Sequence, residues 1–389
     1  MTHGAPGDGV QGAPVPVVDR PRLEPLVARV LGRPAGVTDW QGHAVYGGYG
    51  AASGGVYRFR GHARAGGGDR PLPWSLVLKV VRPSPRASEA PAAWGYWKRE
   101  ALAYRSGLLA DLPGGIAAPR CYGVDEGDDA AWLWLEDLTD AAGAVWPLDQ
   151  FGHAARHLGA FHGAYLAERP LPAAPWLCRD WLRTWLGRCA GGMERLAAAR
   201  DEAAVRRYWP GDVYERALRL WGEREAFLAA LERVPQTVGH GDYKRPNLFA
   251  RTGPGGTRRT VAIDWANVGI APLGLDLAHL VAWSCLFFAA EPADLPELDR
   301  AARAHYADGL RAAGWRGDAR LVELAQAAAT GLLAGVHPWG ASEHSETQRA
   351  GIERAWGRPY DEAAERNARV RAFALDRADA ARALLPRVR

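Results

Sequence analysis

One short stretch of the chain brings together side chains that could take part in a single reaction. The stretch HGDYKRPN contains four such residues: His240, Asp242, Lys244 and Asn247. A fifth, Asp264, comes at the end of the apolar run TVAI, further along the chain. Carboxylate and amide oxygens are ligands that Mg²⁺ accepts from proteins. Phosphoryl transfer needs one carboxylate beside the attacking hydroxyl, and a second carboxylate with an amide oxygen to hold Mg²⁺ against the triphosphate. The residue types and their spacing therefore favour phosphoryl transfer.

The sequence around Asn247 indicates how these groups would be held. The segments LFAR and TVAIDW flank TGPGGTRR, a pattern typical of two strands joined by a tight turn. Such a hairpin would fix Asn247 and Asp264 in register at its open end. Protein kinases use H-R-D-x-x-x-x-N for their catalytic loop, with a second Asp after a short hairpin for magnesium. The interval from Asp242 to Asn247 is the same as in that pattern.

The segment from His240 to Ala278 resembles the aminoglycoside phosphotransferase and choline kinase-like family. That family has H-G-D in place of H-R-D, then an I-D-W/F segment that leads into a D-L-A helix; the corresponding segment here is IDWANVGIAPLGLDLAHL. The similarity extends from about Tyr46 to Leu280, and the last hundred residues contain no matching motif. A β-rich first third followed by a helix-rich remainder agrees with this resemblance. We therefore expect an α+β, bilobal protein kinase-like fold with a β-rich N-lobe and a larger helical C-lobe.

The resemblance implies a role for each matching residue of the loop. Asp242 would be the catalytic base or the carboxylate that orients the hydroxyl, and Asn247 and Asp264 would be Mg²⁺ ligands. Lys244 would neutralise charge on the transferred phosphoryl group. Two further residues would hold the geometry of the loop: His240 and Asp276.

The N-lobe would supply the nucleotide site. Lys79 interrupts the apolar strand WSLVLKVV, and burying a lysine without an anionic partner is costly. The resemblance implies that Lys79 reaches the α- and β-phosphates and that Glu100, in the following helix, pairs with it. It also implies a glycine-rich loop over the phosphates at 47–55, with Ser53 and Gly54, and a hinge whose backbone receives adenine. The hinge would consist of Leu135, Glu136 and Asp137.

The hydrophobic pattern along the chain predicts three regions. Residues 1–20 are rich in Gly and Pro and predict a disordered tail. Residues 21–138 predict the N-lobe up to the hinge, and residues 139–389 predict a helical C-lobe with the catalytic loop, the metal site and the substrate region. Within the N-lobe we expect helices at 21–32 and 90–112 and strands near 43–46, 56–59, 74–81 and 131–135. After 234 we expect a loop that leads to the hairpin.

Composition excludes several classes of protein. The formal charge of +4 is spread along the chain with no run of five consecutive Arg or Lys, so we do not expect nucleic-acid binding. The longest apolar stretch, 281–290, is too short to span a bilayer, and no signal peptide is recognisable. Four cysteines without metal-binding spacing are typical of reduced thiols. We expect a cytoplasmic monomer or homodimer that binds neither nucleic acid nor membrane.

Lysine and asparagine are scarce. Only three of the 48 Lys and Arg residues are lysine, and three residues are asparagine, which is typical of a GC-rich genome. A Lys or Asn retained under such pressure is a candidate for a role that Arg or Asp cannot fill. These residues are Lys79, Lys98, Lys244, Asn247, Asn267 and Asn367.

The sequence leaves the acceptor of the phosphoryl group open. ATP, or another nucleoside triphosphate, with Mg²⁺ would be the donor, and a hydroxyl group of an antibiotic is the preferred acceptor. The alternatives are a metabolite kinase for an amino alcohol, a sugar or a nucleoside, and a nucleotide-binding protein without catalysis. Residues 151–239 contain 13 Arg against 10 Asp and Glu, which does not favour a polycationic aminoglycoside. Three tryptophans of this region are expected to pack in the core, with stacking on a flat ligand as the alternative: Trp176, Trp181 and Trp185.

Overall fold

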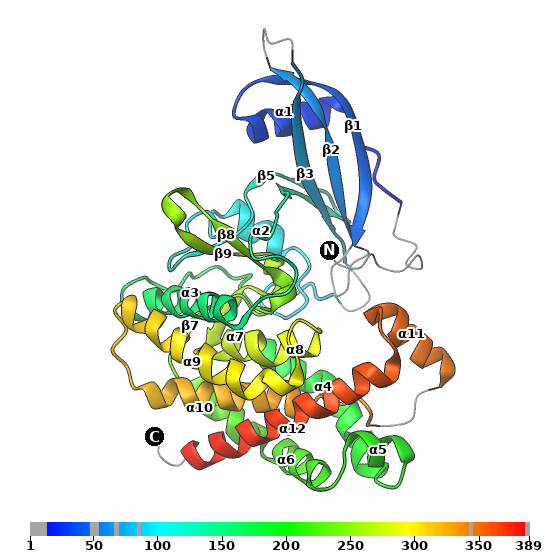
Figure 1. Cartoon of the computed structure of the whole chain (residues 1–389), viewed down its shortest axis with the longest axis vertical. Helices are drawn as coiled ribbons and strands as arrows, with labels where there is room; N and C mark the ends of the chain where they lie inside the picture. Colours follow the sequence, from blue (N-terminus) through cyan, green and yellow to red (C-terminus); the bar gives the residue numbers. More distant parts are fainter. Residues whose placement is uncertain (1–13, 47–53, 66–69, 84–86, 342–344, 386–389) are drawn as a thin grey trace.

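The computed structural model describes residues 14–46, 54–65, 70–83, 87–341 and 345–385. These residues form a strand-rich lobe at one end of the molecule and a larger helical lobe at the other (Figure 1). The expected α+β, bilobal fold is confirmed. Residues 1–13 of the expected tail and residues 47–53 of the expected glycine-rich loop lie outside the described residues.

The N-lobe is built on a five-stranded antiparallel sheet. The strands lie in the order β1-β2-β3-β6-β5, so β3 is central. Their bounds are β1 Ala35–Tyr46, β2 Gly55–Ala65, β3 Leu72–Val81, β5 Cys121–Glu126 and β6 Ala131–Glu136. Helix α1 (Arg20–Leu31) packs its apolar face on the sheet, and the Asp19 carboxylate caps its first turn by accepting from Arg22 N. Lys79 therefore lies in the best-supported strand of the lobe, opposite Val56 on one side and Leu133 on the other.

Helix α2 (Arg99–Arg105) is much shorter than the helix expected at 90–112. The residues before Arg99 form turns instead. The Arg99 guanidinium donates to Pro91 O at 3.0 Å and to Ala93 O at 2.5 Å. The Arg99 side chain, which lies outside this segment, supplies hydrogen bonds to both carbonyl groups. A proline in the segment also disfavours the helical conformation of the residue before it. The prediction of a long helix was wrong because the periodicity did not reveal this contact.

The C-lobe contains most of the helices. Their bounds are α3 Leu148–Ala167, α4 Trp181–Ala198, α5 Ala203–Tyr208, α6 Asp212–Arg233, α7 Leu275–Ala278, α8 Ser284–Leu286, α9 Leu295–Ala312, α10 Ala319–Thr330, α11 Glu346–Trp356 and α12 Tyr360–Leu384. Two π-helical segments lie among these helices, at His279–Trp283 and Gly331–Gly335. Short 3₁₀ turns lie at Arg245–Asn247, Pro254–Gly256, Trp265–Asn267 and Pro292–Asp294. Among the described helices, none is both long enough and apolar enough to cross a membrane.

Helices α3 and α9 pack closely against each other along their length. A Cβ atom added at Gly159 of α3 would lie 2.1 Å from Tyr306 O, and one at Gly309 of α9 would lie 2.1 Å from Arg156 O. Glycine is therefore required at both contacts because the two backbones touch. The catalytic segment packs against this pair of helices.

Short strands position the catalytic segment against helices α3 and α9. Strand β7 (Gln236–Gly239) lies where a loop was expected and pairs with β10 (Gly269–Pro272). Strands β8 (Leu248–Thr252) and β9 (Arg258–Ala262) form the expected hairpin, and β9 also pairs with β4 (Ile116–Ala117). The sequence analysis missed β7 for two reasons. A pattern of four residues is too short to indicate a strand, and the partner strand β10 is distant in the sequence.

We expect the buried Arg99 to be a major source of stability. Its guanidinium also donates to Trp176 O at 2.7 Å and to Ala266 O at 2.9 Å, so it joins the N-lobe to the C-lobe. Arg99→Met should lower the free energy of unfolding by at least about 3 kcal/mol, because buried carbonyl groups lose their donor. Arg105→Met, on the same helix, removes an exposed ion pair with Glu126 and should cost at most about 1 kcal/mol. Equal urea midpoints for the two variants would contradict this expectation.

Candidate active site

The loop after β7 needs glycine at its second position. Gly241 has φ +78°, and a Cβ atom there would lie 2.6 Å from Asn267 O. A larger residue would be strained in its backbone and would also clash with the neighbouring chain. The glycine of H-G-D is thus explained by one close contact with the backbone of Asn267.

His240 links this loop to the end of β9. It is 1% exposed; its Nδ1 accepts from Asp242 N at 3.2 Å, and its Nε2 donates to Ile263 O at 3.0 Å. Burial lowers the pKa of His240, so the ring is neutral and keeps its proton on Nε2. These contacts are those of a residue that holds the geometry of the loop.

The buried Asp276 carboxylate fixes the start of the loop. It accepts from His240 N at 2.6 Å and from Gly241 N at 2.9 Å. His162 Nε2 and His279 Nδ1 lie 3.5 and 3.4 Å from its two oxygens. Burial alone would raise the pKa of Asp276, but the hydrogen bonds from the two histidines outweigh it and hold the pKa far below its usual value. Asp276 is therefore an anion that braces the loop.

Asp242 is held through one of its two carboxylate oxygens. The side chain lies in a residue that is 8% exposed, and Oδ2 accepts from Asn247 Nδ2 at 2.9 Å and from Lys244 Nζ. The other oxygen, Oδ1, is buried and has no hydrogen-bond partner among the described residues. A buried acceptor without a donor is unfavourable unless another molecule supplies one. Asp242 is therefore oriented by the protein with one oxygen available to a ligand.

Lys79 lies between two carboxylates, one from each lobe. Its Nζ is 2.5 Å from Glu100 Oε2 and 2.6 Å from Asp264 Oδ1. Burial alone would lower the pKa of Lys79, but the charges of Asp264 and Glu100 outweigh it and raise the pKa above its usual value. The pairing of Lys79 with Glu100 predicted from the sequence is present in the structure, and Asp264 is an additional partner.

Asp264 has an unusual backbone conformation. Its φ of 65° and ψ of 60° lie in the left-handed region, which costs a non-glycine residue of order 1–3 kcal/mol. Its carboxylate reaches Lys79, whose charge overrides burial and lowers the pKa of Asp264. Trp265 N, the next residue in the chain, donates to Glu100 Oε1 at 3.3 Å. The turn after β9 therefore stores strain to aim this carboxylate at the lobe boundary.

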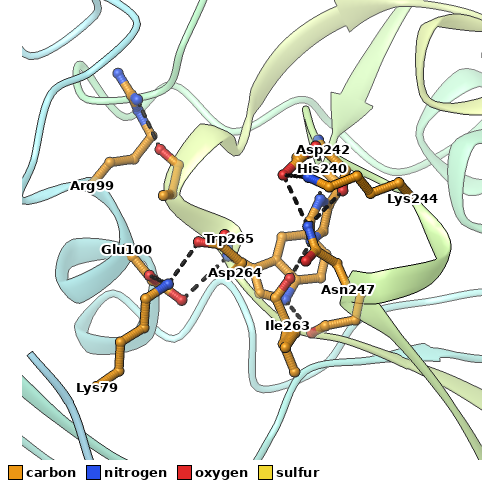
Figure 2. A network of polar contacts seen from close by, with 12 residues as sticks. Lys79, Arg99, Glu100, His240, Asp242, Lys244, Asn247, Ile263, Asp264 and Trp265 are labelled. Atoms are coloured by element: carbon orange, nitrogen blue, oxygen red, sulfur yellow. Dashed lines mark hydrogen bonds and ion pairs between the residues drawn. The ribbon is translucent and has the colours of Figure 1, made fainter. Parts of the chain in front are cut away.

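Asn247 and Asp264 form a donor set of the type that Mg²⁺ accepts. In the hairpin Leu248 pairs with Ala262, and Ile263 N donates to Asn247 O at 2.9 Å, so both residues lie at the same end. In Figure 2 Lys79 and Glu100 lie on one side of Asp264, and Asp242, Lys244 and Asn247 lie on the other. Among the described residues no three His, Cys, Asp or Glu side chains form a metal site by themselves. One carboxylate and one amide oxygen fit Mg²⁺ that takes its other ligands from phosphate and water.

The predicted hinge lies where β6 leaves the sheet. Leu135 is still paired within it, and Glu136 N donates to Arg120 O at 2.9 Å. The Asp137 carboxylate is bound by three side chains of β2 and β3, namely Arg58, Arg60 and Ser75. Adenine recognition by this backbone remains a prediction, and the amide of Glu136 is already occupied.

The predicted glycine-rich loop is described only at its end. Gly54 N donates to Val80 O at 2.8 Å, and a Cβ atom at Gly54 would lie 2.8 Å from Val80 Cγ1. Gly54 therefore fits tightly beside β3, one residue beyond Lys79. Ser53 lies outside the described residues, and its phosphate contact remains a prediction.

Sequence reasoning missed Arg245, which anchors the loop from below. It is 6% exposed and donates to Asp140 Oδ2 at 2.7 Å, to Gly143 O at 2.8 Å and to Leu248 O at 2.8 Å. Asp140 Oδ1 in turn accepts from Ala250 N at 3.0 Å. Arg245 lies inside the HGDYKRPN segment, but in an arginine-rich chain its residue type gave no signal.

The sequence matches the model of the phosphotransferase enzyme family over residues 57–317. The match begins in β2 and ends after α9, so it includes the central strands of the N-lobe and the whole catalytic segment. No curated protein is significantly similar to the chain in sequence. The resemblance predicted from the H-G-D and I-D-W segments is confirmed by this match.

Solved structures of similar fold agree with that assignment. A microcompartment-associated aminopropanol kinase is 13% identical with a TM-score of 0.50, covering 89% of this chain and 94% of that one. A choline kinase from Cryptosporidium parvum Iowa II is 12% identical with a TM-score of 0.51, covering 88% and 89%. An aminoglycoside phosphotransferase from Alicyclobacillus acidocaldarius is 15% identical with a TM-score of 0.50, covering 96% and 98%. At such identities the similarity shows a shared fold.

We expect Lys79 and Glu100 to be coupled in nucleotide binding. Lys79→Met and Glu100→Gln should each weaken binding of Mg²⁺-ATP, and a double-mutant cycle by calorimetry should show a coupling of at least about 1 kcal/mol. Lys98→Met removes a nearby lysine whose Nζ lies 3.7 Å from Glu126 Oε1, and it should leave binding unchanged. Strict additivity of the two substitutions would mean that the ion pair has no part in binding.

Proposed function

The chain belongs to the phosphotransferase enzyme family, and from that premise we propose that it transfers the γ-phosphoryl group of ATP, or of another nucleoside triphosphate, to a hydroxyl group of a small molecule. The Asp242 carboxylate is the observation that supports this most strongly. One of its oxygens is fixed by Asn247 and Lys244, while the other is buried without a partner among the described residues. An acceptor hydroxyl would donate to Asp242 Oδ1 and lose its proton there as the hydroxyl oxygen attacks the γ-phosphorus. The bond between the γ-phosphorus and the bridging oxygen would break, and the nucleoside diphosphate would leave.

Catalysis in this proposal is mostly positioning and charge neutralisation. Asp276 and His240 hold the loop rigid, so Asp242 would meet the hydroxyl without first rearranging. Lys244 would compensate the charge that moves onto the transferred group, since its ammonium already lies at Asp242. Lys79 would bind the α- and β-phosphates, as the family resemblance implies.

Asn247 and Asp264 would hold the metal ion. Mg²⁺, when bound, neutralises charge on the phosphate oxygens. The Asp264 carboxylate pairs with Lys79, so the proposed metal ligand and the proposed phosphate-binding lysine lie side by side, which supports the proposal. The low pKa of Asp264 keeps it an anion, as a magnesium ligand must be.

The acceptor proposed from the sequence is an antibiotic, which would make the protein a resistance or self-protection kinase. A metabolite kinase for an amino alcohol, a sugar or a nucleoside is the alternative. Both share the Asp242 chemistry, so residues beyond the catalytic loop distinguish them. A nucleotide-binding protein without catalysis is the least supported candidate, because Lys79, Asp242 and Asp264 are all present and mutually oriented.

Loss of the Asp242 carboxylate should abolish turnover but not nucleotide binding. Asp242→Asn should lower kcat by at least about 10²-fold while the affinity for Mg²⁺-ATP changes little, because the proton acceptor is lost and the phosphate contacts remain. Phosphorylated products from pooled alcohols are measured by mass spectrometry, with Asp149→Asn on the exposed start of α3 as the matched control. Full turnover in Asp242→Asn would refute the role of this residue.

Loss of the Asp264 carboxylate should instead remove the magnesium dependence of nucleotide binding. Calorimetric titration of Asp264→Ala with ATP should give the same weak affinity with and without Mg²⁺, whereas the unchanged protein should bind much more tightly with Mg²⁺. A variant that still gains affinity from Mg²⁺ would place the metal elsewhere.

A further inference from the structure

The C-lobe contains a pocket of about 190 Å³ with an aromatic lining, referred to below as the aromatic pocket. It lies between the first turns of α4, the segment around α8, the loop after the second π-helical segment and the start of α12. Its lining consists of Trp185, Trp283, Leu286, Phe287, His337, Trp339, Ala363 and Asn367.

The aromatic pocket adjoins the catalytic loop. Lys244 Nζ lies 4.5 Å from the ring centroid of Phe287 and 5.7 Å from that of Trp283, and the same ammonium pairs with Asp242. Lys244 therefore links two lining rings of the pocket to the proposed proton acceptor, although it is not itself part of the lining. The rings of Trp283 and Phe287 thus lie close to the lysine that pairs with Asp242.

Irregular backbone borders the pocket on two sides. One π-helical segment ends at Trp283, and the other, Gly331–Gly335, ends just before His337. Phe288, next to Phe287, has φ 60° and is one of two described non-glycine residues with positive φ; the other is Asp264. Single-turn π segments and strained residues are frequent at functional sites. The chain therefore departs from regular helix at the edge of this pocket.

A buried cation lies behind the pocket and has no anionic partner among the described residues. Arg371 is fully buried and donates to Tyr208 O, His337 O, Trp339 O and Asn367 Oδ1, at 2.7 to 3.1 Å. All four acceptors are neutral. Burial lowers the pKa of Arg371 to about 9, so the guanidinium still carries its charge at neutral pH. Among the described residues that line the pocket there is no carboxylate. The local charge is positive and disfavours a cationic ligand.

The two polar side chains of the lining are neutral and bound to each other. Because Arg371 can only donate, Asn367 presents its oxygen to Arg371 and its Nδ2 to His337 Nδ1, at 3.4 Å. Burial and the charge of Arg371 lower the pKa of His337 to about 3, so the ring is neutral with its proton on Nε2. Neither side chain offers a charge to a ligand.

The remaining surface is almost all ring and methyl carbon. Trp185 and Trp283 pack edge to face at 5.2 Å, and both indole nitrogens are buried away from solvent. A cavity of roughly 150 Å³ lined by apolar side chains holds a benzene molecule. The aromatic pocket therefore has room for one ring system of a ligand and not for a chain of several sugars.

From this arrangement, and on the basis of the function proposed above, we propose that the acceptor alcohol inserts an uncharged ring into the aromatic pocket. The enzyme would then select uncharged alcohols that carry a planar ring, and it would discriminate against ammonium compounds and saturated polyols. Aromatic faces also attract ammonium groups. Here, however, the Lys244 ammonium already lies over Trp283 and Phe287, and the charge of Arg371 behind the pocket has no anionic partner among the described residues. Asn367 both accepts from Arg371 and contacts His337 Nδ1 through its amide nitrogen, and an aspartate has no such donor.

The test compares three sets of alcohols with the full-length protein and Mg²⁺-ATP. The first set holds uncharged alcohols that carry a planar ring (uridine, 2-phenylethanol and chloramphenicol), the second holds cations (choline, ethanolamine and kanamycin), and the third is glucose, an uncharged polyol whose ring is saturated. We expect a kcat/KM at least 10-fold higher for the best member of the first set. Preference for the second or third set would overturn the inference and leave the phosphotransferase function intact. Absence of both products and Mg²⁺-ATP binding would instead refute the proposed function.

If Mg²⁺-ATP binds but no alcohol is phosphorylated, binding of the alcohols themselves tests the proposal. The members of the first set should quench tryptophan fluorescence of the protein, and those of the second should not. Absence of quenching by every ring-bearing alcohol would overturn the inference.

Two opposite changes of the pocket separate recognition from folding. Trp185→Leu removes one wall, and Ala363→Phe, from α12, fills the space. Both should raise KM for the ring-bearing acceptor at least 10-fold while kcat and the KM for ATP stay within 2-fold. Trp221→Leu removes a partly buried tryptophan of α6 outside the lining, with Arg224 over its ring at 4.4 Å, and should change none of these constants. An unchanged acceptor KM in both pocket variants would overturn the proposal.

Discussion

The site depends on one buried negative charge. Asp276 lies at the start of α7 and is almost fully shielded from water, where an unpaired carboxylate would be very unfavourable. Its compensation draws backbone amides of the catalytic loop, His162 of α3 and His279 of the π-helical segment to one point. The loop that presents Asp242 has its shape because these donors must converge on Asp276.

Three buried arginines donate hydrogen bonds to carbonyl groups of irregular backbone, in the way that backbone amides do within helices and sheets. Arg99 binds carbonyl groups of the turns before α2, Arg245 those of the segment before α3, and Arg371 those of the loop after the second π-helical segment. A guanidinium carries five donors in a rigid plane, so a single side chain can satisfy several carbonyl groups at once. These segments border the lobe boundary, the catalytic loop and the aromatic pocket. At each of these places the backbone is neither a regular helix nor a regular strand.

The sequence by itself determined the chemistry and the class of fold. The interval between Asp242 and Asn247, the hairpin before Asp264 and the lone Lys79 in an apolar strand are local patterns, and each reflects a local physical requirement. The family match agrees with them. The scarcity of asparagine was also informative: Asn247 holds Asp242, Asn267 packs on Gly241, and Asn367 lies in the aromatic pocket.

Tertiary structure alone decided which residues support these groups and what surrounds the acceptor. Helix α2 is short because the Arg99 side chain, which also reaches the C-lobe, binds carbonyl groups of the turns before the helix, and β7 exists because β10 lies beside it. The aromatic pocket collects Trp185, Trp283, His337 and Asn367 from four separate segments, and its charge depends on Arg371, which is absent from the lining. Such properties arise from contacts between residues far apart in the chain, and neither spacing nor periodicity contains them.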